Sequence, residues 1–388
     1  MQTESEGDTA QVMRGALPKI RFPGFEENWQ SEPLGNLCIV LNNQRKPVAS
    51  VKRVSGPYPY YGASGIVDFI SEFLFDERLV LVGEDGAKWG AYENTAFIAS
   101  GKYWVNNHAH VLRPQRIVDA LLVSYLTMTD LAPFVTGAAP PKLTLDNLKK
   151  IRIPFPPLCE EQRKISDCLS FLDACIGTET RKLDALKAHK QGLMQKLFPA
   201  EGQSLPRLRF SGFEDKWEAK LLKDVSPLQR GFDLPSNKLR QGKVPVVYSN
   251  GVQNFHDTGI AVAPGIVTGR SGTIGKINFI GSGKYWPHNT SLWVTSFCGN
   301  VPLFVYYLFN FIGMERFVSG SGVPTLNRND VHIFQTHVPS PAEQNRIATC
   351  LSSMDDLLAA QSRKIDALRQ HKKGLTQGLF PGIEVHVP

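Results

Sequence analysis

Two long heptad patterns, offset from each other by 182 residues, constrain this sequence more than any other feature. Apolar residues recur at alternating steps of three and four from position 165 to 197 and again from 347 to 379, which is the spacing of a coiled-coil seam. The seam residues are Ile165, Leu169, Leu172, Ile176, Leu183, Leu186, Leu193, Ile347, Leu351, Met354, Leu358, Ile365, Leu368 and Leu375. The polar residues that interrupt both copies at the same two steps are Glu179, Lys190, Gln361 and Lys372. The repeat therefore predicts two long helices with matching apolar stripes.

A seam of this length needs a partner helix, and the second copy supplies one within the same chain. Each helix is expected to be roughly 55 Å long at about 1.5 Å per residue. Phe198-Pro199 and Phe380-Pro381 end the helices because proline cannot continue them. Polar seam residues can fix the register of such a pair. The competing interpretation is that each stripe is the core-facing side of an ordinary helix, but length, strict spacing and duplication favour pairing.

The rest of the chain is duplicated as well. The segment from Pro18 to Trp29 returns from Pro206 to Trp217, and Gly-Lys-Tyr-Trp occurs at 101–104 and again at 283–286. A Glu-Gln pair stands at the start of each heptad pattern. A period of 182 to 188 residues is too long for a solenoid repeat. We therefore expect two copies of a unit made of one globular domain and one long helix.

Each globular part is predicted to consist of short strands and turns. Runs at 58–65 and 79–83, and at 244–251 and 260–269, are apolar or aromatic and are bounded by glycine. Short helices are expected near 118–128 and 302–311, and extended proline-containing segments lead into the long helices. Strands and helices are segregated along the chain. The predicted class is α+β: two tandem β-rich domains plus two long helices.

Composition and charge indicate which kind of partner and which cellular compartment to expect. The chain has 388 residues, a net charge of +7 and a pI near 9.0, which favours a polyanionic partner. No apolar stretch approaches the roughly 18 residues that span a bilayer, and the acidic start of the chain is not a signal peptide. The six cysteines lack disulfide or zinc spacing. We expect a cytoplasmic protein without membrane contact, with reduced thiols.

The sequence lacks the motifs of common enzymes that act on nucleic acids. It has no Asn-Pro-Pro-aromatic segment of an amino-methyltransferase and no Pro-Asp pair of a nuclease metal site. Gly275-Lys276 is not part of a Walker A motif because Arg270 stands where a glycine is needed. The histidines lack ligand spacing. We therefore predict no catalytic residue, no metal site and no cofactor in this chain.

Two glycine-rich loops, at 83–90 and 269–275, share a frame but differ in their polar residues. Glycine allows a tight turn and close approach to a partner. The candidate DNA-binding residues are Glu84, Asp85 and Lys88 in the first loop and Arg270, Ser271 and Thr273 in the second. A carboxylate can accept from cytosine N4, whereas arginine suits the O6/N7 edge of guanine. The alternative is a glycine-rich hairpin whose arginine only touches phosphate or solvent.

A second set of candidates follows each Lys-Tyr-Trp motif. These are Asn106, Asn107 and His108 in the first copy and His288, Asn289 and Thr290 in the second. Asparagine can pair with adenine, but Asn beside His also commonly caps the end of a strand. The aromatic residues of the motif are expected in the core. Weaker candidates, mainly for phosphate contact, are Lys142, Thr144, Thr325, Asn327 and Arg328.

Taken together, these segments resemble the specificity subunits of type I restriction–modification systems, over about residues 17–381. The resemblance rests on the opening Pro-Lys-Ile-Arg-Phe-Pro-Gly-Phe…Trp, on Gly-Arg-Ser-Gly-Thr-Ile-Gly, on Gly-Lys-Tyr-Trp-Pro-His-Asn-Thr, and on Pro-Pro-Leu…Glu-Gln-Arg-Lys-Ile at the entry to the first long helix. The first loop departs from the second, with Glu84-Asp85 in place of Arg270-Ser271. This departure leaves open which base each loop would read.

The resemblance implies a fold, a function and partners. It implies a tail (1–14), a first target-recognition domain (15–158), a first long helix (159–199), a second target-recognition domain (200–338), a second long helix (339–381) and a tail (382–388). The helices would pair antiparallel, and each domain would read half of a split sequence in double-stranded DNA. Two methyltransferase subunits and restriction/translocase subunits would dock, and S-adenosylmethionine, ATP and Mg would serve those partners. The chain itself would be non-catalytic.

Geometry adds an expectation about spacing. Half-sites on one face of B-DNA lie about 34 Å apart, a separation that rigid paired helices could fix, so inserting about four residues into one helix should change the gap or abolish binding. One competing hypothesis is a coiled-coil scaffold for protein assembly that does not read DNA. Another is an enzyme with an unrecognised site. A steep salt dependence of DNA binding, which phosphate contacts produce, would separate the DNA-reading subunit from the scaffold.

Overall fold

The computed structural model describes residues 17–137, 140–319 and 324–381. The chain forms two compact units. The first comprises Met1–Thr180 and Lys364–Pro388, and the second comprises Arg181–Arg363. The expected tails, and parts of the turns after Gly137 and Ser319, lie outside the described residues. Each unit contains one globular domain and a segment of each long helix, so the boundaries between units fall inside the helices.

The globular part of the first unit contains two four-stranded sheets. The strand order in one sheet is β2 (Cys38–Val40), β9 (Ala109–Pro114), β6 (Leu79–Gly83), β7 (Ala96–Ala99). The order in the other is β4 (Gly65–Ile70), β3 (Ser55–Gly62), β8 (Lys102–Val105), β5 (Phe75–Asp76), with β3 and β8 parallel. The remaining elements are β1 (Gln30–Pro33) paired with β10 (Arg152–Phe155), and the helices α1 (Leu34–Leu37), α2 (Asp119–Met128) and α3 (Leu145–Lys150).

The second unit repeats this plan strand for strand. One sheet has the order β12 (Leu228–Arg230), β19 (Ser291–Val294), β16 (Gly265–Gly269), β17 (Ile277–Ile280), and the other β14 (Gly251–His256), β13 (Val244–Tyr248), β18 (Lys284–Pro287), β15 (Ala261–Val262). Strands β11 (Glu218–Leu221) and β22 (Gln335–Val338) pair, as do the short β20 (Val318–Ser319) and β21 (Thr325–Leu326). The helices are α5 (Leu222–Val225), α6 (Pro302–Ile312) and α7 (Arg328–His332). The tandem α+β organisation predicted from the sequence is confirmed.

Local sequence explains most of these elements. The fully buried strands β6 and β16 are the continuous apolar runs that end in glycine. The run predicted at 260–269 is one exception, because it forms two strands separated by Ala263-Pro264. Pro264 has no backbone N–H for a sheet. Helix α6 begins at Pro302 and ends before Gly313, whose φ of 74° suits glycine.

The repeated motifs at the start of each domain and of each long helix meet in space. In the first unit, the guanidinium of Arg21 pairs with both oxygens of the buried Glu161 carboxylate at 2.8 and 2.9 Å. The Trp29 indole also donates to this carboxylate, at 3.4 Å. In the second unit Arg209 binds Glu343 in the same way, at 2.9 and 2.8 Å. Each buried carboxylate thus attaches the start of its domain to the first turn of a long helix.

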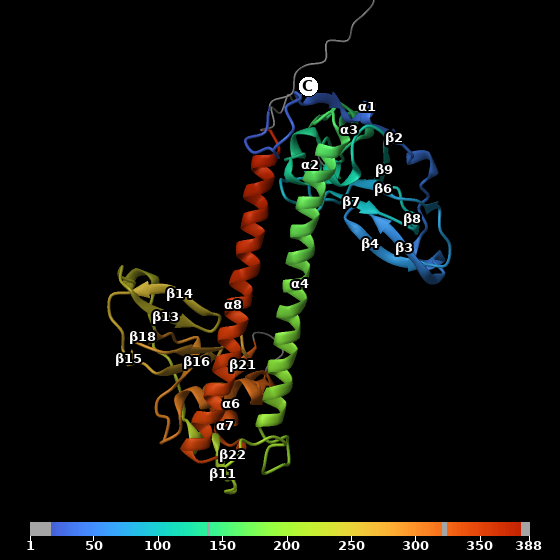
Figure 1. Cartoon of the computed structure of the whole chain (residues 1–388). Coiled ribbons are helices and arrows are strands. Elements are labelled where there is room, and N and C mark those ends of the chain that lie inside the picture. The colour runs from blue at the N-terminus through green and yellow to red at the C-terminus, as the bar shows by residue number, and fades with distance from the viewer. Residues whose placement is uncertain (1–16, 138–139, 320–323, 382–388) are drawn as a thin grey trace, which may run out of the picture. The chain divides into compact units, whose positions relative to one another are not determined.

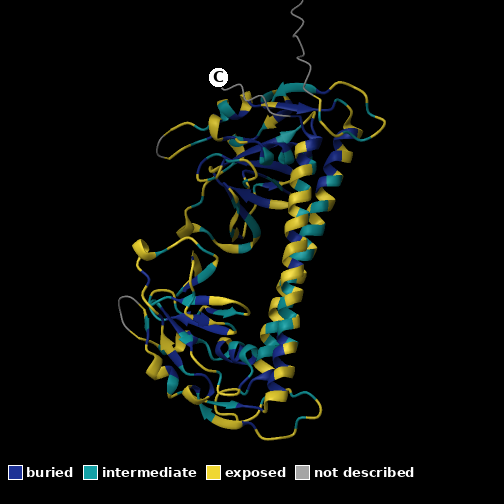
Figure 2. Ribbon diagram, turned by 90° about the vertical axis from the view of Figure 1, so that its left-hand side faces the viewer, coloured by how far each residue is buried: buried dark blue, intermediate teal, exposed yellow. Residues whose placement is uncertain are grey.

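The long helices are α4 (Cys159–Leu197) and α8 (Pro341–Leu379), each 39 residues long. Every predicted seam residue is buried or half-buried, whereas Phe171 and Leu357, which lie off the seam, are 68% and 53% exposed. In Figure 2 exposed and half-buried residues alternate along the middle of the helices, and buried residues lie near their ends. Among the described residues, none of the helices is both long enough and apolar enough to cross a membrane.

Within each unit the segments of α4 and α8 pair side by side (Figure 1). In the first unit Asp173 binds Lys372 at 2.5 Å, and Glu179, farther along α4, binds Lys364, nearer the start of α8. The numbering runs in opposite directions, so the pairing is antiparallel. In the second unit Lys190 binds Asp355 at 2.5 Å, the internal-repeat counterpart of the pair between Asp173 and Lys372. The lysines that interrupt the seam therefore make ion pairs between the helices.

The last turn of each long helix packs on the opening segment of a domain. In the first unit the Ile20 N–H donates to the Gly378 carbonyl at 2.9 Å, and Trp29 meets Phe380 edge-on with ring centroids 6.4 Å apart. In the second unit the Leu208 N–H donates to the Lys196 carbonyl at 2.9 Å. Each core therefore includes residues from the end of the other copy's helix.

Candidate nucleic-acid interface

The two glycine-rich loops follow the buried strands β6 and β16, and both use the same backbone frame. In the first domain the Glu84 N–H donates to the His108 carbonyl and the Glu84 carbonyl accepts from the Leu143 N–H, both at 2.8 Å. In the second domain Arg270 makes the same two bonds, at 2.9 Å to the Thr290 carbonyl and at 2.8 Å from the Leu326 N–H. Positions 84 and 270 are therefore structurally equivalent and carry opposite charges.

Glycine is required where these loops begin. A Cβ atom on Gly269 would lie 1.8 Å from the Thr273 carbonyl oxygen, and one on Gly83 would lie 2.7 Å from the Ala63 carbonyl oxygen. Real Cβ atoms do not approach backbone oxygens so closely. The glycines thus permit a tight turn that brings the following polar residues against neighbouring segments.

In the first domain Asp85 is enclosed by two basic side chains. Its carboxylate contacts His108 Nδ1, and its Oδ2 lies 3.0 Å from Lys142 Nζ. Burial alone would raise the pKa of Asp85, but the hydrogen bonds with Lys142 and His108 outweigh it, and the pKa lies below its ordinary value. Asp85 is therefore ionised at neutral pH, and both oxygens already have partners within the protein.

Glu84 is paired in the same cluster. Arg45 Nη1 lies 2.6 Å from Glu84 Oε2, and Lys142 Nζ lies 3.8 Å from Oε1. Oε2 is buried and has no well-directed hydrogen bond, so its contact with Arg45 is an ion pair rather than an aligned bond. Burial also lowers the pKa of the neighbouring His110, whose ring binds the Leu143 carbonyl. The negative charges of the first glycine-rich loop are thus largely neutralised by basic residues of the same domain.

The other predicted residues of the first domain have mainly local contacts. Asn106 is buried, and its Oδ1 accepts from the His108 N–H at 2.8 Å, so it caps the end of a strand. Thr144 is the N-cap of α3 and accepts from the Asn147 N–H at 3.3 Å. Lys88 and Asn107 are exposed. Of these residues, only Lys88 and Asn107 present freely accessible polar side chains.

In the second domain Arg270 borders an open groove of about 750 Å³. Its Nε donates to the Asn289 carbonyl at 3.0 Å. Arg230, at the end of β12, lines the same groove. Burial, and secondarily the positive charge of Arg230, lower the pKa of Arg270 below its ordinary value. Lowering an arginine pKa leaves the group charged at neutral pH, so this groove is strongly cationic.

The structure brings several other predicted residues to this groove. Asn289, Thr325, Asn327 and Arg328 line it together with Arg270. Asn327 is also the N-cap of α7, through its Oδ1 and the Asn329 N–H at 3.0 Å. The remaining predicted residues, Ser271, Thr273, His288 and Thr290, are not among the lining residues.

His288 and Thr290 bond to each other at 3.1 Å beneath the reader loop. Burial lowers the pKa of His288. This pair supports the loop from below, in the place that Asn106 and His108 occupy in the first domain.

Sequence reasoning missed two residues of the site, Arg45 and Arg230. Arg45 follows β2 and pairs with Glu84, whereas Arg230 ends β12 and lines the same groove as Arg270; each precedes its loop by about 40 residues. The dipeptide Gln-Arg occurs at 44–45 and again at 229–230, within the range of the repeat period. This duplicated dipeptide was the available signal. By contrast, Tyr103, Trp104 and Tyr285 are buried as expected.

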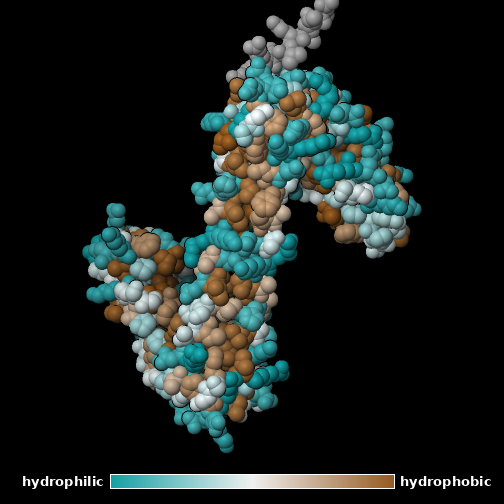
Figure 3. Space-filling model, in the orientation of Figure 1, coloured by the Kyte–Doolittle hydropathy of each residue, from teal (hydrophilic) through white to brown (hydrophobic). Residues whose placement is uncertain are grey.

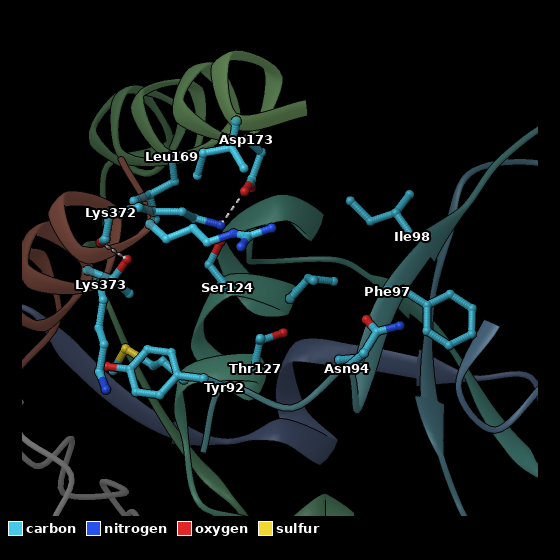
Figure 4. A pocket seen from close by; sticks show the side chains of 16 residues that line it. Tyr92, Asn94, Phe97, Ile98, Ser124, Thr127, Leu169, Asp173, Lys372 and Lys373 are labelled. Atoms are coloured by element: carbon cyan, nitrogen blue, oxygen red, sulfur yellow. Dashed lines mark hydrogen bonds and ion pairs between the residues drawn. The ribbon is translucent and has the colours of Figure 1, made fainter. Parts of the chain in front are cut away.

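A separate cavity of about 500 Å³ lies within the first unit, between α2, β7 and the segments of α4 and α8 (Figure 4). Its walls combine apolar side chains with polar and charged ones. Two of its lysines have partners: Lys372 binds Asp173, and Lys373 lies 4.7 Å from the centre of the Tyr92 ring. No group of His, Cys, Asp or Glu within residues 17–137, 140–319 and 324–381 is arranged to hold a metal.

The outer faces of the long helices carry apolar residues of their own. Phe171 and Leu357 are the most exposed large ones. Figure 3 shows apolar side chains among hydrophilic ones along the exposed helix surface of the first unit. Phe171 and Leu357 stand on different helices, and single exposed apolar residues of this kind are common on protein surfaces.

Comparison with known proteins agrees with these features. A family model described as the type I restriction modification DNA specificity domain matches residues 26–188 and again 214–370. A putative type I restriction enzyme specificity subunit of Haemophilus influenzae is 30% identical over 359 residues, 89% of this chain and 91% of that protein. The MjaVIII specificity subunit of Methanocaldococcus jannaschii is 28% identical over 229 residues, 55% of this chain and 52% of that protein.

Two solved structures share the fold at 16% identity. One is the S subunit of a type I restriction–modification system from M. genitalium, with a TM-score of 0.66, covering 95% of this chain and all of that chain. The other comes from work on complex assembly and conformational transition in a type I R-M system, with a TM-score of 0.57, covering 94% of this chain and 99% of that chain. Both likenesses extend over the two domains and the two helices.

Proposed function

This chain belongs to the type I restriction–modification DNA specificity family, and from that membership we propose that it is the DNA-reading subunit of such a complex. In this role each target-recognition domain reads one half of a bipartite sequence. The paired helices set the gap between the halves and carry the methyltransferase subunits. The chain performs no catalysis itself. The family match over both copies favours this function over a scaffold that does not read DNA.

One observation carries the proposal. Two copies of a single backbone frame hold Glu84 at one position and Arg270 at the equivalent one. A symmetric scaffold has no need for opposite charges at equivalent sites. Two domains that read different bases can use such a difference, because the guanidinium of Arg270 can recognise a base edge whereas the Glu84 carboxylate is already paired with Arg45. The net charge of +7 suits the phosphate backbone, which supplies sequence-independent affinity.

The partners follow from the same proposal. Two methyltransferase subunits dock on the chain, with the exposed apolar residues of the long helices as part of the contact surface. Restriction/translocase subunits join that core. S-adenosylmethionine, ATP and Mg serve these partners and not this chain, and the complex works on cytoplasmic DNA.

The test is to express the chain with its methyltransferase partners in a host that lacks other DNA methylation and to sequence the methylated positions. We expect one split motif with a gap of constant length. Omitting this chain, while keeping the methyltransferase, should abolish the methylation. A continuous motif, or methylation that persists without the chain, contradicts the proposal.

A further inference from the structure

We propose that Arg270 reads a guanine in the half-site of the second domain, and that Asn289 and Asp233 position its guanidinium for this contact. The inference rests on the proposed DNA-reading function and assigns a base class to one loop. Arg230 provides the second positive charge of the same groove. The first domain, with Glu84 at the equivalent position, has no such reader.

The orientation of Arg270 is the first argument. Its Nε–H is bound to the Asn289 carbonyl at 3.0 Å. A guanidinium has five N–H donors in a planar fork, so the terminal amino groups remain available for a ligand. Two parallel donors match the O6 and N7 acceptors of guanine in the major groove. An arginine that is held at Nε and open at its tip is arranged for this bidentate contact.

A chain of hydrogen bonds holds the residue that orients Arg270. The Asn289 side-chain amide donates to Asp233 Oδ1 at 2.6 Å. Asp233 lines the groove, yet its carboxylate forms no ion pair with Arg270. Asp233 therefore acts as a positioning residue through Asn289 and leaves the guanidinium uncompensated.

The charge balance of the groove is the second argument. Across the described residues, none of Arg230, Arg270 and Arg328 has a carboxylate oxygen within 4.0 Å. Burial of Arg270, and secondarily the positive charge of Arg230, disfavour its charged form in the isolated protein and lower its pKa. An electron-rich ligand offsets this effect. In the first domain the equivalent residue, Glu84, carries the opposite charge and is already paired with Arg45 and Lys142.

The backbone is built to bring the two arginines together. A Cβ on Gly231 would lie 2.2 Å from the His288 carbonyl oxygen. Glycine at this position lets the chain after β12 pass directly against the segment from His288 to Thr290, where Phe232 and His288 form a β-bridge. This close approach places Arg230 on the wall of the groove that contains Arg270.

The test uses the full chain with its methyltransferase partners and reads the methylated motif. We expect a required guanine in one half-site of the wild-type motif. Arg270→Gln should reduce discrimination for that guanine by about 5- to 150-fold, the range for one bidentate contact, while the other half-site stays unchanged.

Asp233→Ala should relax the requirement for guanine at the same position. Asp233→Asn keeps an acceptor for Asn289 and should restore the requirement. Arg240→Gln, at an exposed arginine paired with Asp257 in the same domain, is the control.

A measurement on DNA avoids dependence on the folding of a variant. Replacing the required guanine by 7-deazaguanine in a synthetic duplex removes only the N7 acceptor. Methylation by the wild-type complex should fall, and if the Arg270→Gln complex assembles it should show no further loss from this replacement.

Three results overturn the inference. They are a second half-site without guanine, an Arg270→Gln variant that weakens all sequences equally as a phosphate contact would, and full activity of the wild-type complex on 7-deazaguanine DNA. In each case a split motif that depends on the chain would still support the proposed function.

Discussion

At the scale of single residues, one buried carboxylate in each unit attaches the domain to a long helix: Glu161 in the first unit and Glu343 in the second. The Glu161 side chain is fully buried and binds Arg21, which is 140 positions away in the chain, in a bidentate contact. A buried ion pair adds little net stability compared with apolar residues of the same size, but removing one partner leaves an uncompensated charge. The contact therefore matters mainly because it fixes which segment lies against which helix.

Glu161→Ala is expected to lower the free energy of unfolding by about 3–5 kcal/mol, because Arg21 and the Trp29 indole lose their acceptor. Chemical denaturation of the purified chain measures this. Glu160→Ala is the matched control, since the neighbouring Glu160 side chain is 74% exposed and should cost less than about 0.5 kcal/mol. Equal losses in the two variants would show that the buried carboxylate has no special role.

At the scale of elements, the helix pair is stabilised unevenly along its length. Leu169 and Leu351, near the start of each helix, are 2% and 0% exposed because the domains also cover them. Leu172 and Leu186 are only half-buried. Near Leu186 the ion pair between Lys190 and Asp355 adds to the pairing of the helices, and Tyr307 of α6 also donates to Asp355 at 2.7 Å.

Leu169→Ala and Leu351→Ala are each expected to cost about 2–5 kcal/mol of unfolding free energy, from lost burial plus the cavity left behind. Leu172→Ala and Leu186→Ala should cost less than either. Leu357→Ala, at an exposed position of α8, should change stability by less than about 0.5 kcal/mol. Thermal or chemical unfolding followed by circular dichroism distinguishes these outcomes. A negligible loss at Leu169 would contradict the assignment of the seam.

At the scale of the whole molecule, neither compact unit contains a complete long helix. Each long helix begins in one unit and ends in the other. If the helices set the gap between half-sites, as proposed, the gap can change only when both helices are lengthened or shortened together. The ion pairs of Asp173 with Lys372 and of Lys190 with Asp355 tie the register of each helix to its partner.

Inserting one heptad into both helices, after Thr180 and after Arg363, should lengthen each by about 10 Å while keeping the seam in phase. We expect the gap of the methylated motif to grow by about three base pairs, at about 3.4 Å each. Insertion into one helix alone should abolish methylation, because the cross-helix pairs lose register. The same heptad placed between Gln203 and Ser204, in an exposed loop, is the control. An unchanged gap after the double insertion would refute the role of the helices as a ruler.

Local periodicity and duplication were sufficient to predict much of this protein. A heptad seam is a property of residues that are near each other in the sequence, and it was enough to place α4 and α8. The buried strands β6 and β16 could be placed from apolar runs that end in glycine. The equivalence of the two loops followed from the internal repeat. The family resemblance added the direction of pairing, which the ion pairs of Asp173 with Lys372 and of Glu179 with Lys364 confirm in the first unit.

Only the tertiary structure decided which residues surround each loop and which segments share a core. Arg45 meets Glu84 and Arg230 flanks Arg270 because β2 and β12 lie in the same sheets as β6 and β16. Phe380 joins the core of the first domain although it lies far beyond that domain in the chain. The repeated Gln-Arg dipeptide marks Arg45 and Arg230, but strand order and helix docking decide which loop each of them faces. The charge of each groove, and hence what it can bind, is therefore set by the assembled fold.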